Sequence, residues 1–162
     1  SMAFFRAIYD EVAANYADVE RDYAYVDALS MYLVQRPQSY DVMVAENMYG
    51  DIISDLAAGL VGGLGMAPSG DIGEDAAVFQ PSHGTAPDIA GRGLANPIAM
   101  VLSAALMLRW LGDRAGDGAA HEGAERIEAA VRAVVGAGGV GTPDLGGAMT
   151  SGELGARIVE AL

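Results

Sequence analysis

The sequence predicts an α/β protein, and three observations support that prediction. Apolar residues recur at helical spacing over three long stretches, at residues 3–17, 98–111 and 122–136. Short β-prone runs stand between the helical stretches, at residues 23–26, 42–44 and 76–79. The chain has 162 residues, 52% of them hydrophobic, and no cysteine, so it can bury a core without disulfides. We therefore expect helices packed on a sheet.

The first part of the chain, up to residue 60, predicts three helices separated by short extended segments. The helices are expected at residues 3–17, 27–35 and 50–60. Asp27 is suited to cap the second helix, and Pro37 ends it because proline has no amide hydrogen to donate. The Val-Met-Val run predicts a buried strand within residues 40–45, and the β-prone residues 23–26 predict a shorter one.

Glycine and turn-forming residues separate the later elements. The tract at residues 59–73 carries six glycines and a proline, so we expect a loop there. A strand at residues 76–79 precedes one long ordered loop at residues 80–96. The pair Asn96-Pro97, a capping residue and then a proline, predicts a helix start. The remaining elements are a helix at 98–111, a connection at 112–118, a helix at 122–136, a Gly-rich loop at 138–147 and a terminal helix after a capping box of Thr150 and Glu153.

The chain is strongly acidic, with a formal net charge of −13. This charge disfavours nucleic acids as partners, because binding to phosphates needs clustered cations. All nine basic residues are arginine, so lysine-dependent chemistry such as Schiff-base formation is excluded within this chain. No signal-peptide pattern is present, and the longest apolar region, residues 97–111, is too short to span a bilayer comfortably. We therefore expect a cytoplasmic protein without a membrane partner.

Two carboxylates spaced by one helical turn form the first candidate site. Asp51 and Asp55 lie on one face of the helix predicted at residues 50–60. Like charges there destabilise the helix unless a cation neutralises them, and hard divalent cations take oxygen ligands of this kind. The alternative is a pair of solvated acids that complement the dipole of a helix start, and spacing alone favours it. A third acid, Asp27, is on local grounds a helix cap.

The second candidate site is the loop His-Gly-Thr-Ala-Pro-Asp-Ile-Ala-Gly at residues 83–91. Its glycines let a ligand approach the backbone, and the carboxylate of Asp88 is suited to accept hydrogen bonds from ribose hydroxyls. The alternative is a surface turn in which Asp88 satisfies local backbone groups and His83 is packed, and composition alone favours it. No Gly-x-Gly-x-x-Gly follows a strand, so a dinucleotide needs another architecture here.

Four segments taken together carry a resemblance that none of them carries alone. They are Tyr-Val-Asp-Ala-Leu-Ser-Met at 25–31, the stretch 47–73 with Gly-Asp-Ile-Ile-Ser-Asp inside it, the loop 83–91 with Ala-Asn-Pro at 95–97, and Thr-Pro-Asp-Leu-Gly-Gly at 142–147. In this order they resemble the upstream acidic segment, the metal-binding signature, the cofactor loop and the C-terminal turn of the isocitrate/isopropylmalate dehydrogenase family. The joint match covers nearly the whole chain and favours ligand-binding roles for these acids.

The resemblance implies a metal site and a cofactor site. Asp27, Asp51 and Asp55 would ligate Mg²⁺ or Mn²⁺ together with the substrate, with Asp27 reaching into the site of a second subunit. Asp88 would bind the adenosine ribose of NAD, and its charge would repel the 2′-phosphate of NADP. The implied NAD-binding residues are Gly84, Thr85, Ala86, Pro87, Asp88 and Ile89, with His83 and Asn96 against the adenine.

The implied reaction is oxidation of a malate-type 2-hydroxyacid by NAD, followed by loss of the 3-carboxylate. The metal would act as a Lewis acid. The resemblance makes 3-isopropylmalate, an intermediate of leucine biosynthesis, the first substrate expected. Homoisocitrate and tartrate or other malate analogues share the C-terminal pattern. The Gln-Pro-Ser at residues 80–82 replaces the Glu-Pro-Val commoner in leucine-pathway enzymes, which favours a tartrate- or malate-type relative.

By the same resemblance the chain holds the C-terminal part of an isopropylmalate dehydrogenase-like α/β fold, with helices packed on a mixed sheet that is incomplete without the N-terminal half. Residues 1–60 would belong to the dimer-forming domain and residues 61–162 to the cofactor-binding domain, so we expect a homodimer or higher oligomer. The family's catalytic tyrosine and lysine lie upstream of the matched region. No catalytic residue is therefore expected in this chain, which alone would be inactive. The alternative is a non-catalytic binding or assembly module.

Overall fold

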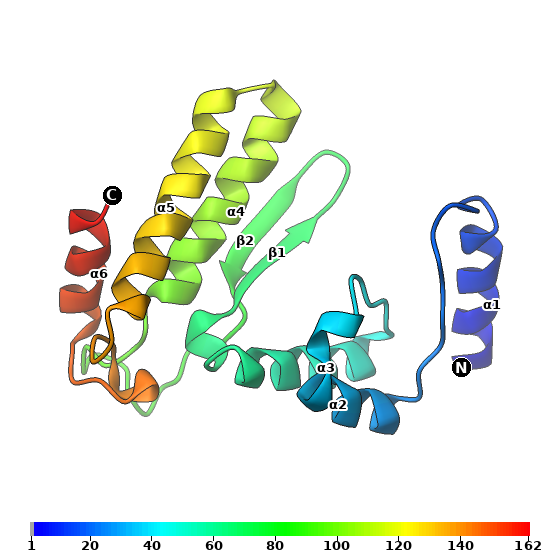
Figure 1. Cartoon of the computed structure of the whole chain (residues 1–162), viewed down its shortest axis with the longest axis horizontal. Helices are drawn as coiled ribbons and strands as arrows, with labels where there is room; N and C mark the ends of the chain where they lie inside the picture. Colours follow the sequence, from blue (N-terminus) through cyan, green and yellow to red (C-terminus); the bar gives the residue numbers. More distant parts are fainter. Residues whose placement is uncertain (1) are drawn as a thin grey trace. The chain divides into compact units, whose positions relative to one another are not determined.

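Two compact units make up the chain. The computed structural model describes residues 2–162, and Ser1 lies outside the described residues. One unit extends to Leu60 and the other covers Val61–Leu162. Figure 1 shows the elements of both units, coloured along the sequence. None of the helices in the described residues is long and apolar enough to cross a membrane.

The first unit is built from helices. Its elements are α1 (Met2–Ala13), α2 (Val26–Gln35), the 3-10 helix η1 (Pro37–Ser39) and α3 (Asn47–Leu60). Helices α2 and α3 pack against each other and bury Leu33, Ile53 and Ala58. Helix α1 buries none of its residues. It contacts the segment that follows it through Tyr9 and Tyr23, whose ring centroids lie 5.8 Å apart in an edge-to-face arrangement.

Several predictions for this unit are wrong. The strands expected at residues 23–26 and 40–45 do not form. A strand needs a neighbour that pairs with its backbone, and neither segment has one in the described part of the chain. Helix α1 ends at Ala13, before the predicted end at residue 17. Asp27 does not cap α2 but lies in its first turn, where its carboxylate accepts the N–H of the next residue at 2.8 Å.

The second unit contains a β-hairpin. Strand β1 covers Pro68–Ile72, strand β2 covers Ala77–Pro81, and the two pair antiparallel with the first residue of β1 opposite the last residue of β2. The strand predicted at residues 76–79 is confirmed by β2. The prediction of a loop throughout the Gly-rich tract is wrong, because β1 lies within it. Pairing with β2 satisfies the backbone of β1, and this outweighs the low strand propensity of residues such as Gly70.

Three helices pack beside the hairpin. They are α4 (Ile98–Ala115), α5 (Gly118–Gly136) and α6 (Ser151–Glu160), with the 3-10 turns η2 (Leu64–Met66) and η3 (Pro143–Leu145) between elements. Helix α4 packs on both strands and on α5, and α5 packs on α6 (Figure 1). The core contains Ile98 of α4, Ala130 and Val131 of α5, and Leu154 and Ile158 of α6. Removal of these side chains from water stabilises this layer of helices.

Capping signals determine where the helices of this unit begin. The carboxylate of Asp117 accepts the N–H of Ala119 at 2.9 Å, so α5 begins earlier than the predicted residue 122. The capping box of Thr150 and Glu153 is confirmed, with both reciprocal hydrogen bonds present. The backbone N–H of Thr150 is the main cause that holds the pKa of Glu153 below its usual value.

A buried serine joins α4 to both strands of the hairpin. Ser103 is 1% exposed, and its hydroxyl lies 2.7 Å from the carbonyl oxygen of Gln80 and 2.8 Å from that of Ala99. The N–H of Ser69 donates to the same hydroxyl at 3.4 Å. These contacts fix the end of β2, which is the point where the second candidate site begins.

Candidate functional site

A long loop joins β2 to α4 and carries the second candidate site. Residues 82–97 contain no helix or strand, so the predicted long loop is confirmed. The loop leaves β2 next to the contact between Gln80 and Ser103, and it ends at Ile98, which is fully buried. Both ends of the loop are therefore anchored in the core of the second unit.

Asp88 is exposed on this loop. Its carboxylate makes no hydrogen bond or ion pair with any other described residue, and the nearby guanidinium of Arg92 donates instead to the backbone oxygen of Asp88, at 3.4 Å. Ala86 precedes it with φ +41°, the only positive φ of a non-glycine residue among residues 2–162. The N–H of Ile89 closes a turn onto the carbonyl oxygen of Ala86 at 3.1 Å. This turn leaves the carboxylate of Asp88 open to a ligand from solvent.

His83 is held against its own backbone. The side chain is half-buried, and Nδ1 lies 2.9 Å from the carbonyl oxygen of Gly84. Gly84 itself has open space where a Cβ would stand, so the loop is accessible at this point. The ring therefore borders the exposed part of the loop.

Asn96 is the buried end of the loop, at 7% exposure. Its Oδ1 accepts the N–H of Ile98 at 3.0 Å. The predicted cap is wrong in detail, because the N-cap of α4 is Pro97 and not Asn96, so the proline does not occupy the first helical position. Its Nδ2 donates to Oδ2 of Asp144 at 3.0 Å and lies 3.7 Å from the sulfur of Met66. The side chain is thus fully engaged, whereas its backbone N–H and C=O make no hydrogen bond within the described residues. The backbone N–H and C=O of Asn96 are therefore its only polar groups without a partner among the described residues.

A distant segment of the chain supports the end of this loop. The hydroxyl of Thr142 donates to Oδ1 of Asp144, whose other oxygen accepts from Asn96. The N–H of Ser151 donates to the carbonyl oxygen of Gly93 at 2.8 Å, and its hydroxyl donates to the carbonyl oxygen of Ala95. The sequence pattern assigned no role to Asp144. Its only local signal is the Thr-x-Asp turn before a capping box, and that signal does not reveal a partner 48 residues away.

A glycine packs directly against this pair. A Cβ on Gly65 would lie 2.8 Å from Cβ of Asn96 and 2.9 Å from Oδ2 of Asp144. Both distances are shorter than van der Waals contact allows, and Cβ of Asn96 cannot move without the backbone. The approach of η2 to the end of the loop therefore requires glycine at this position.

The acids of the first candidate site lie on the first unit. Asp51 and Asp55 are both on α3, on one face and exposed, and Asp27 is exposed on α2. Among residues 2–162 no three acidic, histidine or cysteine side chains gather closely enough to hold a metal ion. A single chain therefore does not bring Asp27 together with the other two. The pair on α3 has the oxygen donors that Mg²⁺ and Mn²⁺ prefer, and it leaves the other coordination positions to further groups.

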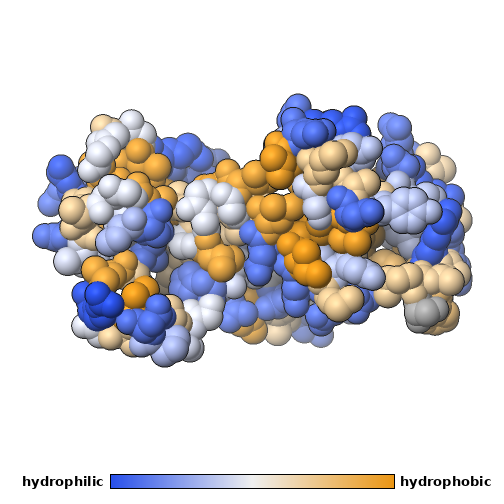
Figure 2. Space-filling model, turned by 90° about the horizontal axis from the view of Figure 1, so that it is seen from below, coloured by the Kyte–Doolittle hydropathy of each residue, from blue (hydrophilic) through white to orange (hydrophobic). Residues whose placement is uncertain are grey.

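Large apolar side chains lie exposed on the same unit. Figure 2 shows apolar surface in the part of the molecule formed by α2 and α3. The exposed fractions are 55% for Met48, 53% for Ile52 and 43% for Leu60 on α3, and 48% for Met31 and 57% for Val34 on α2. Apolar surface of this kind is typical of contacts with another protein.

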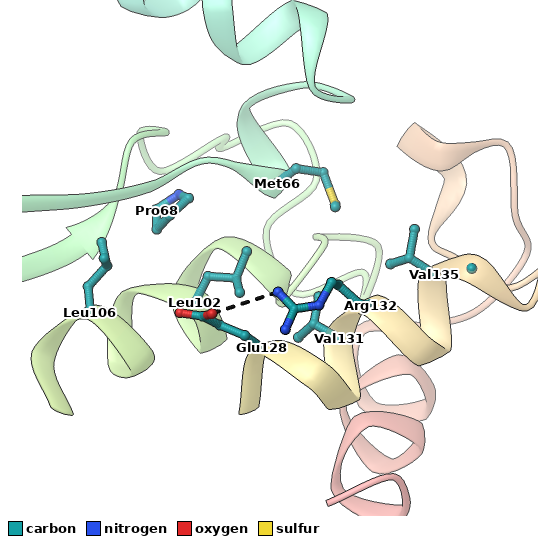
Figure 3. A pocket seen from close by; sticks show the side chains of 9 residues that line it. Met66, Pro68, Leu102, Leu106, Glu128, Val131, Arg132 and Val135 are labelled. Atoms are coloured by element: carbon teal, nitrogen blue, oxygen red, sulfur yellow. Dashed lines mark ion pairs between the residues drawn. The ribbon is translucent and has the colours of Figure 1, made fainter. Parts of the chain in front are cut away.

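An apolar groove of about 480 Å³ lies on the second unit. Its lining includes Met66, Leu102 and Val131, and at its edge Glu128 pairs with Arg132 at 3.7 Å (Figure 3). None of the predicted site residues lines it. The groove therefore shares no residue with the candidate site, although Met66 in its lining also contacts Asn96.

The sequence matches a known family over almost its whole length. The family model described as isocitrate/isopropylmalate dehydrogenase matches residues 1–159. The chain is 46% identical over 156 residues to a 3-isopropylmalate/3-methylmalate dehydrogenase of Methanocaldococcus jannaschii, covering 96% of this chain and 44% of that protein. It is 53% identical over 152 residues to an isocitrate/homoisocitrate dehydrogenase of Thermus thermophilus, covering 94% of this chain and 43% of that protein.

Comparison of the fold with solved structures indicates the same family. The crystal structure of isocitrate dehydrogenase from Methylococcus capsulatus superposes with a TM-score of 0.88 at 46% identity, covering 98% of this chain and 45% of that one. The chain therefore belongs to the isocitrate/isopropylmalate dehydrogenase family, a family of decarboxylating dehydrogenases with an α/β fold. The predicted family and fold class are confirmed. The chain spans less than half the length of the relatives named here.

Proposed function

We propose that the chain is the C-terminal portion of an NAD-dependent, Mg²⁺- or Mn²⁺-dependent oxidative decarboxylase of a malate-type 2-hydroxyacid. The observation that carries the proposal is the loop at residues 82–97. It presents the exposed carboxylate of Asp88 and the unpaired backbone N–H and C=O of Asn96 in a chain of this family.

The loop is proposed to bind the adenosine half of NAD, which supplies the hydride acceptor when bound. The carboxylate of Asp88 can accept hydrogen bonds from both ribose hydroxyls, and its charge repels the 2′-phosphate of NADP. Arg92, the neighbouring cation, is engaged with backbone. The N–H and C=O of Asn96 offer one donor and one acceptor to the adenine edge, and His83 borders the same loop. The intervening residues Gly84, Thr85, Ala86, Pro87 and Ile89 complete the proposed NAD site.

The acids of the first unit are proposed to hold the divalent cation. Asp51 and Asp55 would supply two carboxylates from one subunit, and Asp27 would come from a second copy of the chain. The cation, when bound, polarises the hydroxyl and carboxylate oxygens of the substrate as a Lewis acid. The exposed apolar side chains of α2 and α3 are consistent with a second copy that packs on this unit. We accordingly assign residues 1–60 to a dimer-forming domain and residues 61–162 to a cofactor-binding domain.

The first substrate to test is 3-isopropylmalate. With this substrate we propose a role in leucine biosynthesis and a location in the cytoplasm. Isocitrate or homoisocitrate is the second candidate, because the Thermus thermophilus relative at 53% identity carries that name. The Gln-Pro-Ser at residues 80–82 keeps tartrate and malate among the substrates to be compared. The groups that transfer protons are proposed to lie in the other half of the protein, so that the chain alone is inactive.

The test is NADH formation by the full-length protein with these five acids and Mn²⁺. We expect the highest kcat/KM with 3-isopropylmalate, release of CO₂, loss of activity with a chelator and much weaker activity with NADP. A protein that binds NAD but turns over none of the acids is the non-catalytic module instead. Failure to bind NAD at all overturns the assignment of the loop.

A further inference from the structure

We propose that Asp144 is a positioning residue for the cofactor loop. Its carboxylate holds the side chain of Asn96 and so directs the backbone of Asn96 toward the adenine of the dinucleotide. The inference rests on the proposed NAD function and assigns a role to a residue far from the loop in sequence. Asp144 acts through Asn96 and does not touch the reacting atoms.

The contacts of Asn96 show why its side chain needs a partner. Its Oδ1 is occupied by the N–H of Ile98, which fixes the rotation of the amide group. Its Nδ2 then points to Oδ2 of Asp144 at 3.0 Å in a place that is 7% exposed. Without Asp144 this buried donor loses its oxygen acceptor, and rotation of the amide would break the hydrogen bond that Oδ1 accepts from the N–H of Ile98. Loss of Asp144 therefore loosens the residue whose backbone N–H and C=O have no partner in the chain.

The carboxylate of Asp144 is itself held in place. Its Oδ1 accepts the hydroxyl of Thr142, which is fully buried. The carbonyl oxygen of Thr142 accepts the N–H groups of Leu145 at 3.0 Å and Gly147 at 3.1 Å. A chain of hydrogen bonds therefore runs from the closed turn through Thr142 and Asp144 to Asn96. Such a chain positions an acceptor more accurately than a single exposed side chain would.

A second tether acts on the residues just before Asn96. The N–H and hydroxyl of Ser151 bind the carbonyl oxygens of Gly93 and Ala95. The last residues of the loop are therefore held from both sides, by Ser151 and by Asp144. What stays free is the N–H and C=O of Asn96, the groups assigned to the adenine.

Substitution of Asp144 separates positioning from simple electrostatics. NAD is anionic, so removal of a nearby negative charge would by itself tighten binding. Positioning predicts the opposite. We expect Asp144→Ala to raise the Kd and the KM for NAD about 5- to 30-fold, since one buried donor loses its acceptor, with kcat changed less than about twofold. Asp144→Asn should stay near wild type, because its carbonyl accepts from Asn96 while its amide donates to the hydroxyl of Thr142.

Exchange of the side chains at positions 96 and 144 tests whether NAD affinity can be restored. Asn96→Asp sets two carboxylates against each other and should weaken NAD binding as much as Asp144→Ala does. Adding Asp144→Asn to it restores the hydrogen bonds to Ile98 and Thr142 and the bond between the two side chains, with the same net charge. The new carboxylate at position 96 would accept the backbone N–H of Ile98. It would also accept an N–H of the new amide at position 144. The carbonyl oxygen of that amide would accept the hydroxyl of Thr142. We expect the double variant to recover NAD affinity to within about threefold of wild type.

The measurement is calorimetric binding of NAD and AMP to the full-length protein and its variants, with steady-state kinetics and thermal melts alongside. AMP is the adenosine 5′-phosphate part of NAD without the nicotinamide, so a positioning effect must appear with AMP as well as with NAD. Unchanged Kd in Asp144→Ala, or a double variant no better than Asn96→Asp, overturns this proposal alone. Wild-type protein that binds neither NAD nor AMP overturns the proposed function as well. If all variants lose kcat and thermal stability equally, and the double variant does not recover NAD affinity, the contact is purely structural and the positioning proposal is also overturned. If Asp144→Ala does not fold, the comparison of Asn96→Asp with the double variant tests the proposal instead.

Discussion

Arg109 and Glu128 form a two-pronged ion pair between α4 and α5. The guanidinium donates through Nε at 3.0 Å to one carboxylate oxygen and through Nη2 at 2.9 Å to the other. Arg132, one turn along α5, approaches the same carboxylate at 3.7 Å. The hydrogen bonds from Arg109 hold the pKa of Glu128 below its usual value and raise the pKa of the arginine. The pair therefore ties the two central helices of the second unit together beside their apolar contact.

Replacement of Glu128 by glutamine should make this stabilisation visible as a function of pH. The pKa of Glu128 is lowered in the fold, so the stabilisation is present above the unfolded value of about 4.5 and is lost as the pH falls through the folded value. We expect Glu128→Gln to cost about 1 kcal/mol at neutral pH, a fall in Tm of roughly 2–4 °C. Melts of the full-length protein from neutral to about pH 3 check this. Glu122→Gln on the same helix is the control, and a gap that does not shrink in acid contradicts the prediction.

Replacement of Gly65 by alanine should disturb the end of the cofactor loop. The added methyl group meets Cβ of Asn96 at 2.8 Å and Oδ2 of Asp144 at 2.9 Å, so the backbone at residue 65 or at Asn96 must move, and the carboxylate of Asp144 must shift. We expect a loss of about 1–3 kcal/mol in the free energy of unfolding. Gly123→Ala is the matched control, because its nearest contact is an ordinary 3.5 Å and it lies inside α5, where alanine favours the helix. Equal melting temperatures for the two variants would refute the close contact.

Replacement of Asp51 by asparagine tests the proposed metal site against a solvated acid on the surface of α3. As a metal ligand, Asp51→Asn should weaken Mn²⁺ binding to the full-length protein about 10-fold or more and lower turnover, with little loss of fold. As a solvated acid beyond the first turn of α3, Asp51 gains little from the helix dipole, so the substitution should change stability by no more than about 0.5 kcal/mol and leave activity unchanged. Calorimetric titration with Mn²⁺, and melts without metal, separate the two. Asp41→Asn makes the same charge change on the same unit, and equal Mn²⁺ affinity in all three proteins would sink the metal assignment.

The exposed apolar residues of α2 and α3 predict self-association. Burial of a side chain such as Ile52 in a dimer contact stabilises the assembly by roughly 1.5–3 kcal/mol, so we expect a dimer or larger species in sedimentation at micromolar concentration. Ile52→Glu should shift the equilibrium toward monomer. Val159→Glu, also on an exposed helical position at 67% exposure, should leave it unchanged. A wild-type protein that sediments as a monomer would count against the association.

Signals that act within one or two turns of backbone were readable from the sequence. The capping box at Thr150 consists of local hydrogen bonds and occurs as predicted, and the helix predicted after Asn96-Pro97 begins at Ile98, with Pro97 and not Asn96 as its N-cap. Strand β1 was missed because its stability comes from pairing with β2 and not from the propensity of its own Gly-rich residues. The strands expected at residues 23–26 and 40–45 failed for the converse reason, since no paired neighbour exists in the described residues.

The same distinction applies to the candidate site. Motif order predicted the loop that carries Asp88, and the structure places that residue in the open. Whether Asp88 binds a ribose stays a prediction. The support from Asp144 and Ser151 could not be predicted, because hydrogen bonds between segments about fifty residues apart depend on the packing of α6 on α5. Motifs therefore indicate which residues meet a ligand, while the packed fold shows what holds them.

The chain order of the tethers on the loop has a consequence for its biosynthesis. Asp144 follows Asn96 by 48 residues and Ser151 follows Ala95 by 56, so the ribosome adds both tethers after the loop has been made. At about 5–20 residues per second, the delay is roughly 3–10 s. During that interval the nascent loop lacks the hydrogen bonds that hold its last residues. A ligand that depends on both tethers would therefore meet a complete binding surface only after Ser151 has been synthesised.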